Sequence, residues 1–267
     1  MAITRLKYIT NNLIQAVTPT LSGSWGMDAD YPKANLTNWR MSKRAGFDTA
    51  KAGELVFDMG SAVSIDTCLL FNHNFSSGAT VKIQGHTADS WGAPDVDETI
   101  VYAENDMIEE FTSASKRYWR LSVSDAGRSL SDIKIGEMVL GVAIELTRNF
   151  DWNLAETTAY NNIQQVTNGG NKWSYALYNP KSWVMSFNEL LAAQNTLVKA
   201  MVDNSTGNAY PFSVIIEGVP YYVRALATYG TARPMPIDTL ESGFETSFPL
   251  EYGVSGFELT EETRGIS

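Results

Sequence analysis

The sequence predicts a mainly β protein built from two domains. Short segments of alternating apolar and polar residues, separated by turn residues, fill the first half of the 267-residue chain. The pattern changes near Gly141–Leu146, and the one long amphipathic helix is expected after this point. We therefore expect a β-sandwich or jelly roll over residues 1–143. Residues 144–267 are expected to form a β-sandwich or split barrel that carries one α-helix.

Several segments of the first half have the composition of strands. Over residues 118–123, apolar and polar side chains alternate, which places Trp119 and Leu121 on one face of a strand. Turns that contain glycine, proline or serine separate these segments. The expected strands are Glu54–Met59, Ser64–Phe71, Ala79–Gln84, Tyr118–Val123 and, as one or two strands around Gly136, Asp132–Leu140.

The second half combines strands with a helix. Ser186 and Glu189 form a capping-box pattern, and apolar residues then recur at helical spacing, so we expect a helix over about residues 186–202. A tight link at Gly218–Pro220 joins two expected strands, and Pro249 is expected at an edge or bulge of the last strand. The expected strands are Ile144–Phe150, Trp173–Tyr178, Trp183–Phe187, Phe212–Glu217, Tyr221–Leu226 and Phe244–Tyr252.

The composition excludes several classes of protein. Twenty Lys and Arg against thirty Asp and Glu give a formal net charge of −10, so no basic excess exists for specific nucleic-acid binding. His73, His86 and Cys68 are too few ligands for a structural zinc site. The N-terminus does not have the pattern of a signal peptide, and no window is apolar enough for membrane insertion. We therefore expect a chain that folds in a cytoplasm.

The sequence contains no common catalytic or nucleotide-binding motif. His73 follows an expected strand and is formally a candidate triad base, but no serine has an activating context. The simpler interpretation is a loop histidine that hydrogen-bonds its neighbours. Carboxylates in Asp95–Glu98 and at Glu109–Glu110 are candidates for a glycosidase pair, but both lie in polar, turn-rich stretches, so a solvated surface is the preferred interpretation. The protein is therefore expected not to be an enzyme.

No cofactor and no metal ion is expected, and a bound calcium ion is kept as the alternative. Asp28–Asp30 and Asp95–Asp97 each place two carboxylates one residue apart, and carboxylate oxygens are the ligands that Ca²⁺ prefers. The chain has no EF-hand loop, so these residues would have to act together with backbone carbonyls.

Aromatic residues in turn-like segments provide the candidate glycan-binding site. Sugar-binding sites use exposed aromatic faces beside amide and carboxylate groups, and these residues are also enriched in protein interfaces. The alternative interpretation is that the aromatic residues fill the core or anchor an oligomer interface. The candidates are the aromatic residues Trp25, Tyr31, Trp39 and Trp91, with polar contacts from Asn72 and His73.

Several segments of the first half carry a resemblance to a known family. Tyr31–Leu36, Glu54–Gly60 and Ile65–Phe71 follow the order seen at the opening of discoidin-like (F5/8 type C, galactose-binding-like) domains. Arg117–Leu121 and Ile133–Gly141 resemble the version of this domain found in bacteriophage tail proteins. The resemblance covers about residues 20–141 and implies a galactose-binding-like β-sandwich. It implies no individual sugar-binding residue, because the ligand loops of these domains vary.

In the second half, Trp183 and Phe187 precede the amphipathic helix, and Tyr210–Val214 and Tyr222–Arg224 follow it. This pattern is similar to the β-sandwich-plus-helix unit of phage tail-tube, distal-tail and minor tail proteins. This similarity implies a structural component of a phage tail tip or baseplate in the virion. The chain would assemble with itself as a hexameric or trimeric ring and would contact other tail proteins, with weak binding of host-surface glycan by the first domain. The alternative is a lectin-like module for host attachment without a ring-forming role. An enzyme that cleaves cell-wall or capsule glycan is the third hypothesis.

Overall fold

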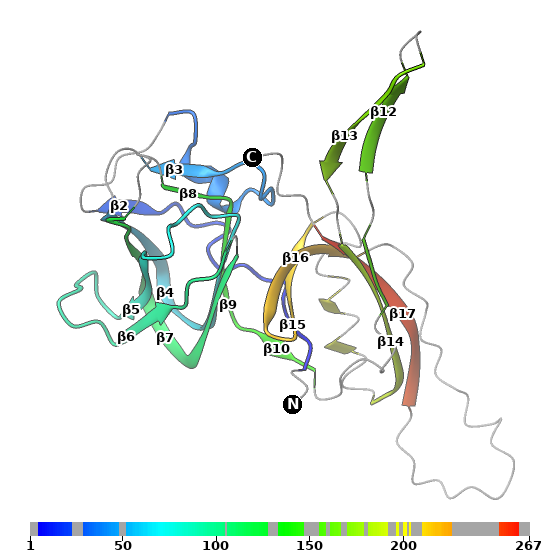
Figure 1. Cartoon of the computed structure of the whole chain (residues 1–267). Coiled ribbons are helices and arrows are strands. Elements are labelled where there is room, and N and C mark those ends of the chain that lie inside the picture. Colours follow the sequence, from blue (N-terminus) through cyan, green and yellow to red (C-terminus); the bar gives the residue numbers. More distant parts are fainter. Residues whose placement is uncertain are drawn as a thin grey trace, which may run out of the picture. The chain divides into compact units, whose positions relative to one another are not determined.

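The computed structural model shows a mainly β protein, which confirms the predicted fold class (Figure 1). It describes residues 5–22, 29–47, 52–104, 106–127, 133–146, 155–158, 161–166, 170–178, 181–191, 196–197, 200–201, 203, 210–225 and 251–261. The described residues fall into two compact units. One, here called the sandwich unit, lies within residues 11–143, and the other, the terminal unit, combines residues 1–10 with 144–262.

The sandwich unit contains one large antiparallel sheet and a second pair of strands. The large sheet has the strand order β2-β4-β7-β5-β6, and β9 also pairs with β4. Strands β3 and β8 form the separate pair, and a short 3-10 helix, η1 (Lys33–Thr37), precedes β3. The strands are β2 (Thr20–Ser22), β3 (Ala45–Phe47), β4 (Ala52–Phe71), β5 (Thr80–His86), β6 (Val96–Ile100), β7 (Met107–Ser124), β8 (Ile133–Ile135) and β9 (Glu137–Gly141).

Two strands of the sandwich unit are much longer than predicted. The expected strands Glu54–Met59 and Ser64–Phe71 are one continuous strand, β4, which pairs with β7 along nearly its whole length. The pairing register shifts between Asp58 and Val63, beside Gly60, which has a positive φ of 74°. Glycine adopts this conformation without the steric cost of a side chain, so the long strand turns here without ending.

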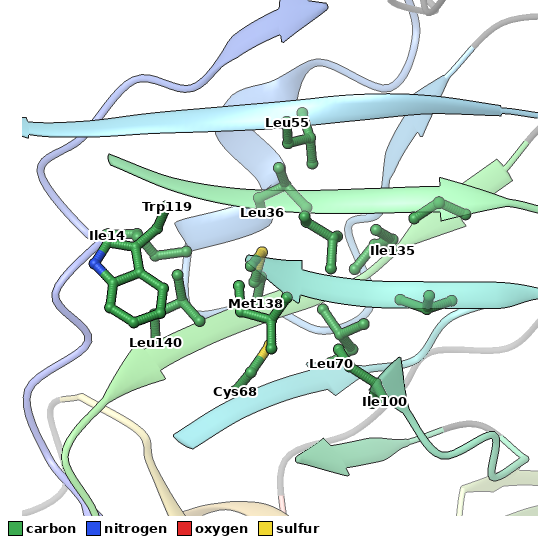
Figure 2. Packing of buried hydrophobic residues seen from close by; sticks show 14 of the residues in the cluster. Ile14, Leu36, Leu55, Cys68, Leu70, Ile100, Trp119, Ile135, Met138 and Leu140 are labelled. Atoms are coloured by element: carbon green, nitrogen blue, oxygen red, sulfur yellow. The ribbon is translucent and has the colours of Figure 1, made fainter. Parts of the chain in front are cut away.

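The core of the sandwich unit lies on one face of the large sheet. Trp119, Leu121 and Val123 of β7 are buried in it, as their alternation predicts. Figure 2 shows Trp119 beside Ile14 and Leu140, with Met138 and Cys68 nearby. Because inward and outward side chains alternate along a strand, Tyr118, Arg120 and Ser122 lie on the opposite face of β7. This opposite face is called the outer face below.

The terminal unit is built around a seven-stranded antiparallel sheet with the order β10-β1-β15-β16-β17-β14-β11. Strands β12 and β13 pair with each other in a separate hairpin. The strands are β1 (Lys7–Ile9), β10 (Ile144–Glu145), β11 (Ala155–Thr158), β12 (Asn161–Val166), β13 (Lys172–Tyr178), β14 (Lys181–Leu191), β15 (Phe212–Ile216), β16 (Val219–Ala225) and β17 (Glu251–Glu261).

The N-terminal strand belongs to the terminal unit, which differs from the predicted domain of residues 1–143. Lys7 pairs with both Glu145 and Ile215, so β1 lies between β10 and β15. Tyr8 is buried, and its hydroxyl donates a hydrogen bond to the carbonyl oxygen of Leu197 at 2.8 Å. Local sequence patterns carry no information about pairing over such separations.

The predicted helix begins later than its capping-box pattern suggests. Ser186 and Glu189 lie in β14, which pairs with β17, so the prediction that the helix starts at Ser186 is wrong. Described residues among 196–203 are helical. Strand pairing with a distant segment has overridden a local capping preference. Of the predicted last strand, Phe244–Tyr252, only residues 251–252 are described, in β17, and Pro249 lies outside the described residues.

The link between β15 and β16 is a two-residue turn, shorter than the predicted Gly218–Pro220 segment. Glu217 and Gly218 both have positive φ values, 53° and 81°. Two consecutive positive φ values are the signature of a type I′ turn, whose twist matches that of a β-hairpin. Val219 and Pro220 are consequently already part of β16.

Candidate glycan-binding surface

Two of the predicted glycan-binding residues are held inside the loops at the end of β4. Asn72 has a φ of 51°, and its side-chain nitrogen donates to the carbonyl oxygen of Met41 at 2.7 Å. His73 is buried, with Nε2 3.0 Å from the carbonyl oxygen of Ala103 and Nδ1 accepting from the backbone N–H of Phe75. Each of these side chains therefore forms a hydrogen-bond contact between two loop segments.

Tyr31 and Trp39 lie in the segment before β3. The ammonium group of Lys134 lies 3.7 Å from the centroid of the Tyr31 ring. The backbone carbonyl oxygen of Tyr31 accepts a hydrogen bond from the N–H of Gly46. Trp39 is half-buried and has a φ of 61°, a conformation that is costly for a large side chain. Trp25, the remaining aromatic candidate in this part of the chain, lies outside the described residues.

The outer face of the large sheet is arranged in three rows that run across the strands. Residues directly opposite each other in antiparallel strands lie on the same face, so the strand register defines each row. The rows are two residues apart along each strand, about 7 Å. The first row is Asp58, Tyr118 and His86, the central row is Val56, Arg120, Gln84 and Asp97, and the third row is Glu54, Ser122, Lys82 and Thr99.

Arg120 is the centre of a hydrogen-bonded network on the outer face. Its Nε donates to Oε1 of Gln84 at 2.7 Å, and its Nη1 donates to Oε1 of Glu54 at 2.7 Å. Nε2 of Gln84 donates in turn to Oδ1 of Asp97 at 2.8 Å, and Lys82 is 3.0 Å from the same carboxylate. Arg120 and Gln84 are both buried, so their orientation is set before any ligand arrives.

Trp91 lies over this network. The loop between β5 and β6 carries it, and the Arg120 guanidinium carbon is 4.5 Å from the centroid of its ring. The indole Nε1 donates to Oδ1 of Asp89 at 2.7 Å, which fixes the edge of the ring. A guanidinium on an aromatic face is a favourable cation–π contact. The Trp91 side chain is therefore held at both its edge and one of its faces.

Ion pairs flank the central row. His86 and Lys116 both approach Oδ2 of Asp95, at 3.0 and 2.7 Å, at the base of the loop that carries Trp91. The hydrogen bond from Lys116 is the largest cause that lowers the pKa of Asp95.

In the first row, Arg117 donates two hydrogen bonds of 2.8 Å to Asp58. This pair, together with the N–H of Gly60, lowers the pKa of Asp58 to about 2. The Arg117 guanidinium also lies 4.9 Å from the centroid of the Tyr118 ring.

Two of the carboxylates that the sequence offered as catalytic or calcium-binding groups are paired with basic side chains. Asp95 and Asp97 bind basic side chains, and Asp28 lies outside the described residues. Burial raises the pKa of Glu109, with smaller contributions from Glu98 and Glu110. Among the described residues, no three His, Cys, Asp or Glu side chains are grouped to hold a metal ion. No helix in the described part of the chain is long and apolar enough to cross a membrane.

Of the predicted glycan-binding residues that the structure describes, Trp91 alone belongs to the Arg120 network. Asn72 instead contacts Met41, which lies in the segment before β3. Tyr31 contacts Lys134 of β8. Sequence reasoning missed Arg120, Gln84 and Tyr118. The signal was present in part, because these residues are the polar positions of alternating strands, but alternation does not show which strands are neighbours.

Comparisons with known proteins give the following findings. No family model matches the chain, and no curated protein matches it. Among solved structures, a chitosan-binding module from a chitosanase/glucanase of Paenibacillus sp. IK-5 is similar, with 16% identity over 49% of this chain and 98% of that chain, at a TM-score of 0.40. The lectin domain of lectinolysin, complexed with Lewis b antigen, has 8% sequence identity over 50% of this chain and 97% of that chain, at a TM-score of 0.41. A fucose-binding module of Streptococcus pneumoniae has 8% sequence identity over 49% of this chain and 94% of that chain, at a TM-score of 0.40.

Proposed function

We propose that the protein is a lectin-like carbohydrate-binding protein and that the outer face of the sandwich unit is its binding surface. The observation that carries this proposal is the Trp91 ring held on the buried Arg120 guanidinium, with Glu54, Gln84 and Asp97 fixed around it. An aromatic platform beside oriented polar groups is a combination that suits a sugar, which has apolar C–H faces and a rim of hydroxyl groups.

The network supplies both kinds of hydrogen-bonding group that a sugar hydroxyl needs. Nη2 of Arg120 has no hydrogen-bond partner among the residues that the structure describes, so it can donate to a ligand. The carboxylates of Glu54 and Asp97 can accept, and hydrogen bonds to charged groups are stronger than neutral ones. Each cation of the network is already paired with a carboxylate, which favours an uncharged glycan over an anionic one.

A glycan array followed by affinity measurements tests this proposal. We expect the protein to bind at least one uncharged glycan and Trp91→Ala to lower that affinity by about 30-fold, as for loss of a central interface tryptophan worth about 2 kcal/mol. Trp39→Ala, in the segment before β3, is the matched control and should leave the affinity unchanged. Absence of binding to every glycan on the array contradicts the proposal. Loss of binding in Trp39→Ala but not in Trp91→Ala would place the binding site at the segment before β3 instead of on the outer face.

A second proposal concerns assembly: the chain forms a ring, a hexamer or trimer, as a structural part of a phage tail tip or baseplate. The β12–β13 hairpin supports the self-association part of this proposal, because these strands pair only with each other among the described residues. The consecutive residues Gln164, Gln165 and Val166 are all exposed, so solvent reaches both faces of β12. An isolated two-stranded hairpin is only marginally stable, and packing against another chain would stabilise it.

Light scattering and electron microscopy test the assembly proposal. We expect a closed ring with a central channel at micromolar concentration, and removal of the β12–β13 hairpin should convert it to monomers. A monomer in both measurements contradicts this proposal and leaves the lectin-like proposal standing. Neither proposal involves a chemical step, so we further propose that the chain is not an enzyme.

A further inference from the structure

We propose that the outer face binds an internal stretch of a linear glycan, about three sugar units long by strand-spacing geometry, and does not select a terminal sugar. This inference rests on the proposed carbohydrate binding and specifies the form of the ligand. It follows from the extent of the three rows and from the accessible side chains of the two flanking rows, Tyr118, Ser122 and Thr99.

The extent of the three rows matches the length of about three sugar units. Tyr118, Arg120 and Ser122 are alternate residues of β7 and lie in the first, central and third rows. They span about 14 Å along the strand, whereas one sugar ring is about as long as the ~4.8 Å between neighbouring strands. A glycan of three units that runs parallel to β7, with its middle unit on Trp91, therefore extends as far as both flanking rows.

Each flanking row offers groups that can contact such a unit. In the first row, the half-buried Tyr118 ring is supported by the Arg117 guanidinium, which repeats the aromatic-on-guanidinium arrangement of Trp91 and Arg120. In the third row, Ser122 is half-buried and Thr99 is exposed, so both rows remain accessible to a ligand. Hydroxyl groups both donate and accept hydrogen bonds, as sugar hydroxyls do.

The paired charges of the flanking rows also suit a neutral chain. Arg117 is bonded to Asp58, and Lys82 to Asp97, so neither row has a cation without a carboxylate partner. An open face contacts a ligand from one side only, whereas sites for single small molecules enclose most of the ligand surface. Affinity for such a face must therefore accumulate over several sugar units.

The test is calorimetry with uncharged oligosaccharides of one to six units, in the β-1,4-glucose, β-1,4-N-acetylglucosamine, α-1,4-glucose and α-1,6-mannose series. We expect affinity in at least one series to rise by about tenfold or more, which is 1.4 kcal/mol, between one and three units, and then to level off. Tyr118→Ala should remove most of this gain but leave monosaccharide binding unchanged. Thr99→Val, a smaller change at an exposed position, should reduce the gain partially, and Tyr31→Ala should have no effect.

The outcomes separate this inference from the proposal on which it rests. Equal affinity for one and three units, unaffected by Tyr118→Ala, overturns the inference but leaves carbohydrate binding in place. The inference is also overturned if blocking the non-reducing terminus of the oligosaccharide abolishes binding, because binding would then require a terminal sugar. If no length of any series binds although a glycan on the array does, the inference fails and carbohydrate binding stands. If nothing on the array binds either, the proposed function itself fails.

Discussion

Replacing Arg120 by methionine removes the donor at the centre of the outer-face network and keeps most of the apolar length of the side chain. Gln84 then loses the donor to its buried Oε1, and Glu54 loses its 2.7 Å ion pair. An unsatisfied buried acceptor costs about 1–3 kcal/mol. The Glu54 side chain is 28% exposed, so water partly replaces its lost partner in the variant. We therefore add only about 1 kcal/mol to the expected loss of stability for this ion pair.

The expected loss for Arg120→Met is therefore about 2–4 kcal/mol in the free energy of unfolding of the sandwich unit. Urea denaturation followed by tryptophan fluorescence measures it as a lower midpoint with an unchanged slope. Glu54→Gln retains an oxygen acceptor for Arg120 and should cost less than about 1 kcal/mol. Arg117→Met, in the exposed pair with Asp58, is the comparison and should lower the midpoint clearly less than Arg120→Met, because exposed ion pairs contribute only about 0–1 kcal/mol.

Two results would refute this reasoning. A stability of Arg120→Met within about 0.5 kcal/mol of the unmodified protein would show that the network contributes nothing beyond surface ion pairs. A Glu54→Gln variant as unstable as Arg120→Met would show that the charge of Glu54, and not the oriented hydrogen bonds, is what matters.

Three further predictions follow from other parts of the sandwich unit. Gly136→Ala should destabilise it by about 1–3 kcal/mol in urea denaturation, because the new Cβ would lie 2.5 Å from a backbone oxygen, whereas Gly78→Ala, with open space around it, should be nearly neutral. Asp58 should titrate near pH 2 by carboxyl NMR, and Arg117→Gln should return it toward the ordinary value. Because this pKa is lowered on folding, its stabilising effect is full above the unfolded value near 4 and is lost as the pH falls toward 2. Cys68, whose pKa burial raises, should react with thiol reagents only after unfolding, and modification under native conditions would contradict its burial.

Local sequence pattern predicted the inward face of the sandwich unit well. Alternation places Trp119 and Leu121 on one face of β7, and both are buried in the core. One or two strands were also predicted around Gly136, and the structure has two, β8 and β9, on either side of it. Such features depend on neighbouring residues only, which is why a single sequence contains them.

The features that sequence reasoning missed depend on contacts between distant segments. Arg120 is a polar residue in an alternating strand, and its burial follows from the register of β4 and β5 against β7. The N-terminal strand was assigned to the wrong unit because its partner, β15, lies about two hundred residues away. Ser186 has a helical capping pattern, but pairing of β14 with β17 decides its structure.

The central claim is that glycan contacts Trp91 on the outer face, and NMR of the indole N–H groups tests it most directly. The chain has seven tryptophans, and Trp-to-Phe variants assign their signals. Titration with a glycan that binds should shift the Trp91 signal at a concentration that matches the calorimetric affinity, with the Trp39 signal unmoved. A saturating glycan that shifts Trp39 and leaves Trp91 unchanged would contradict the account.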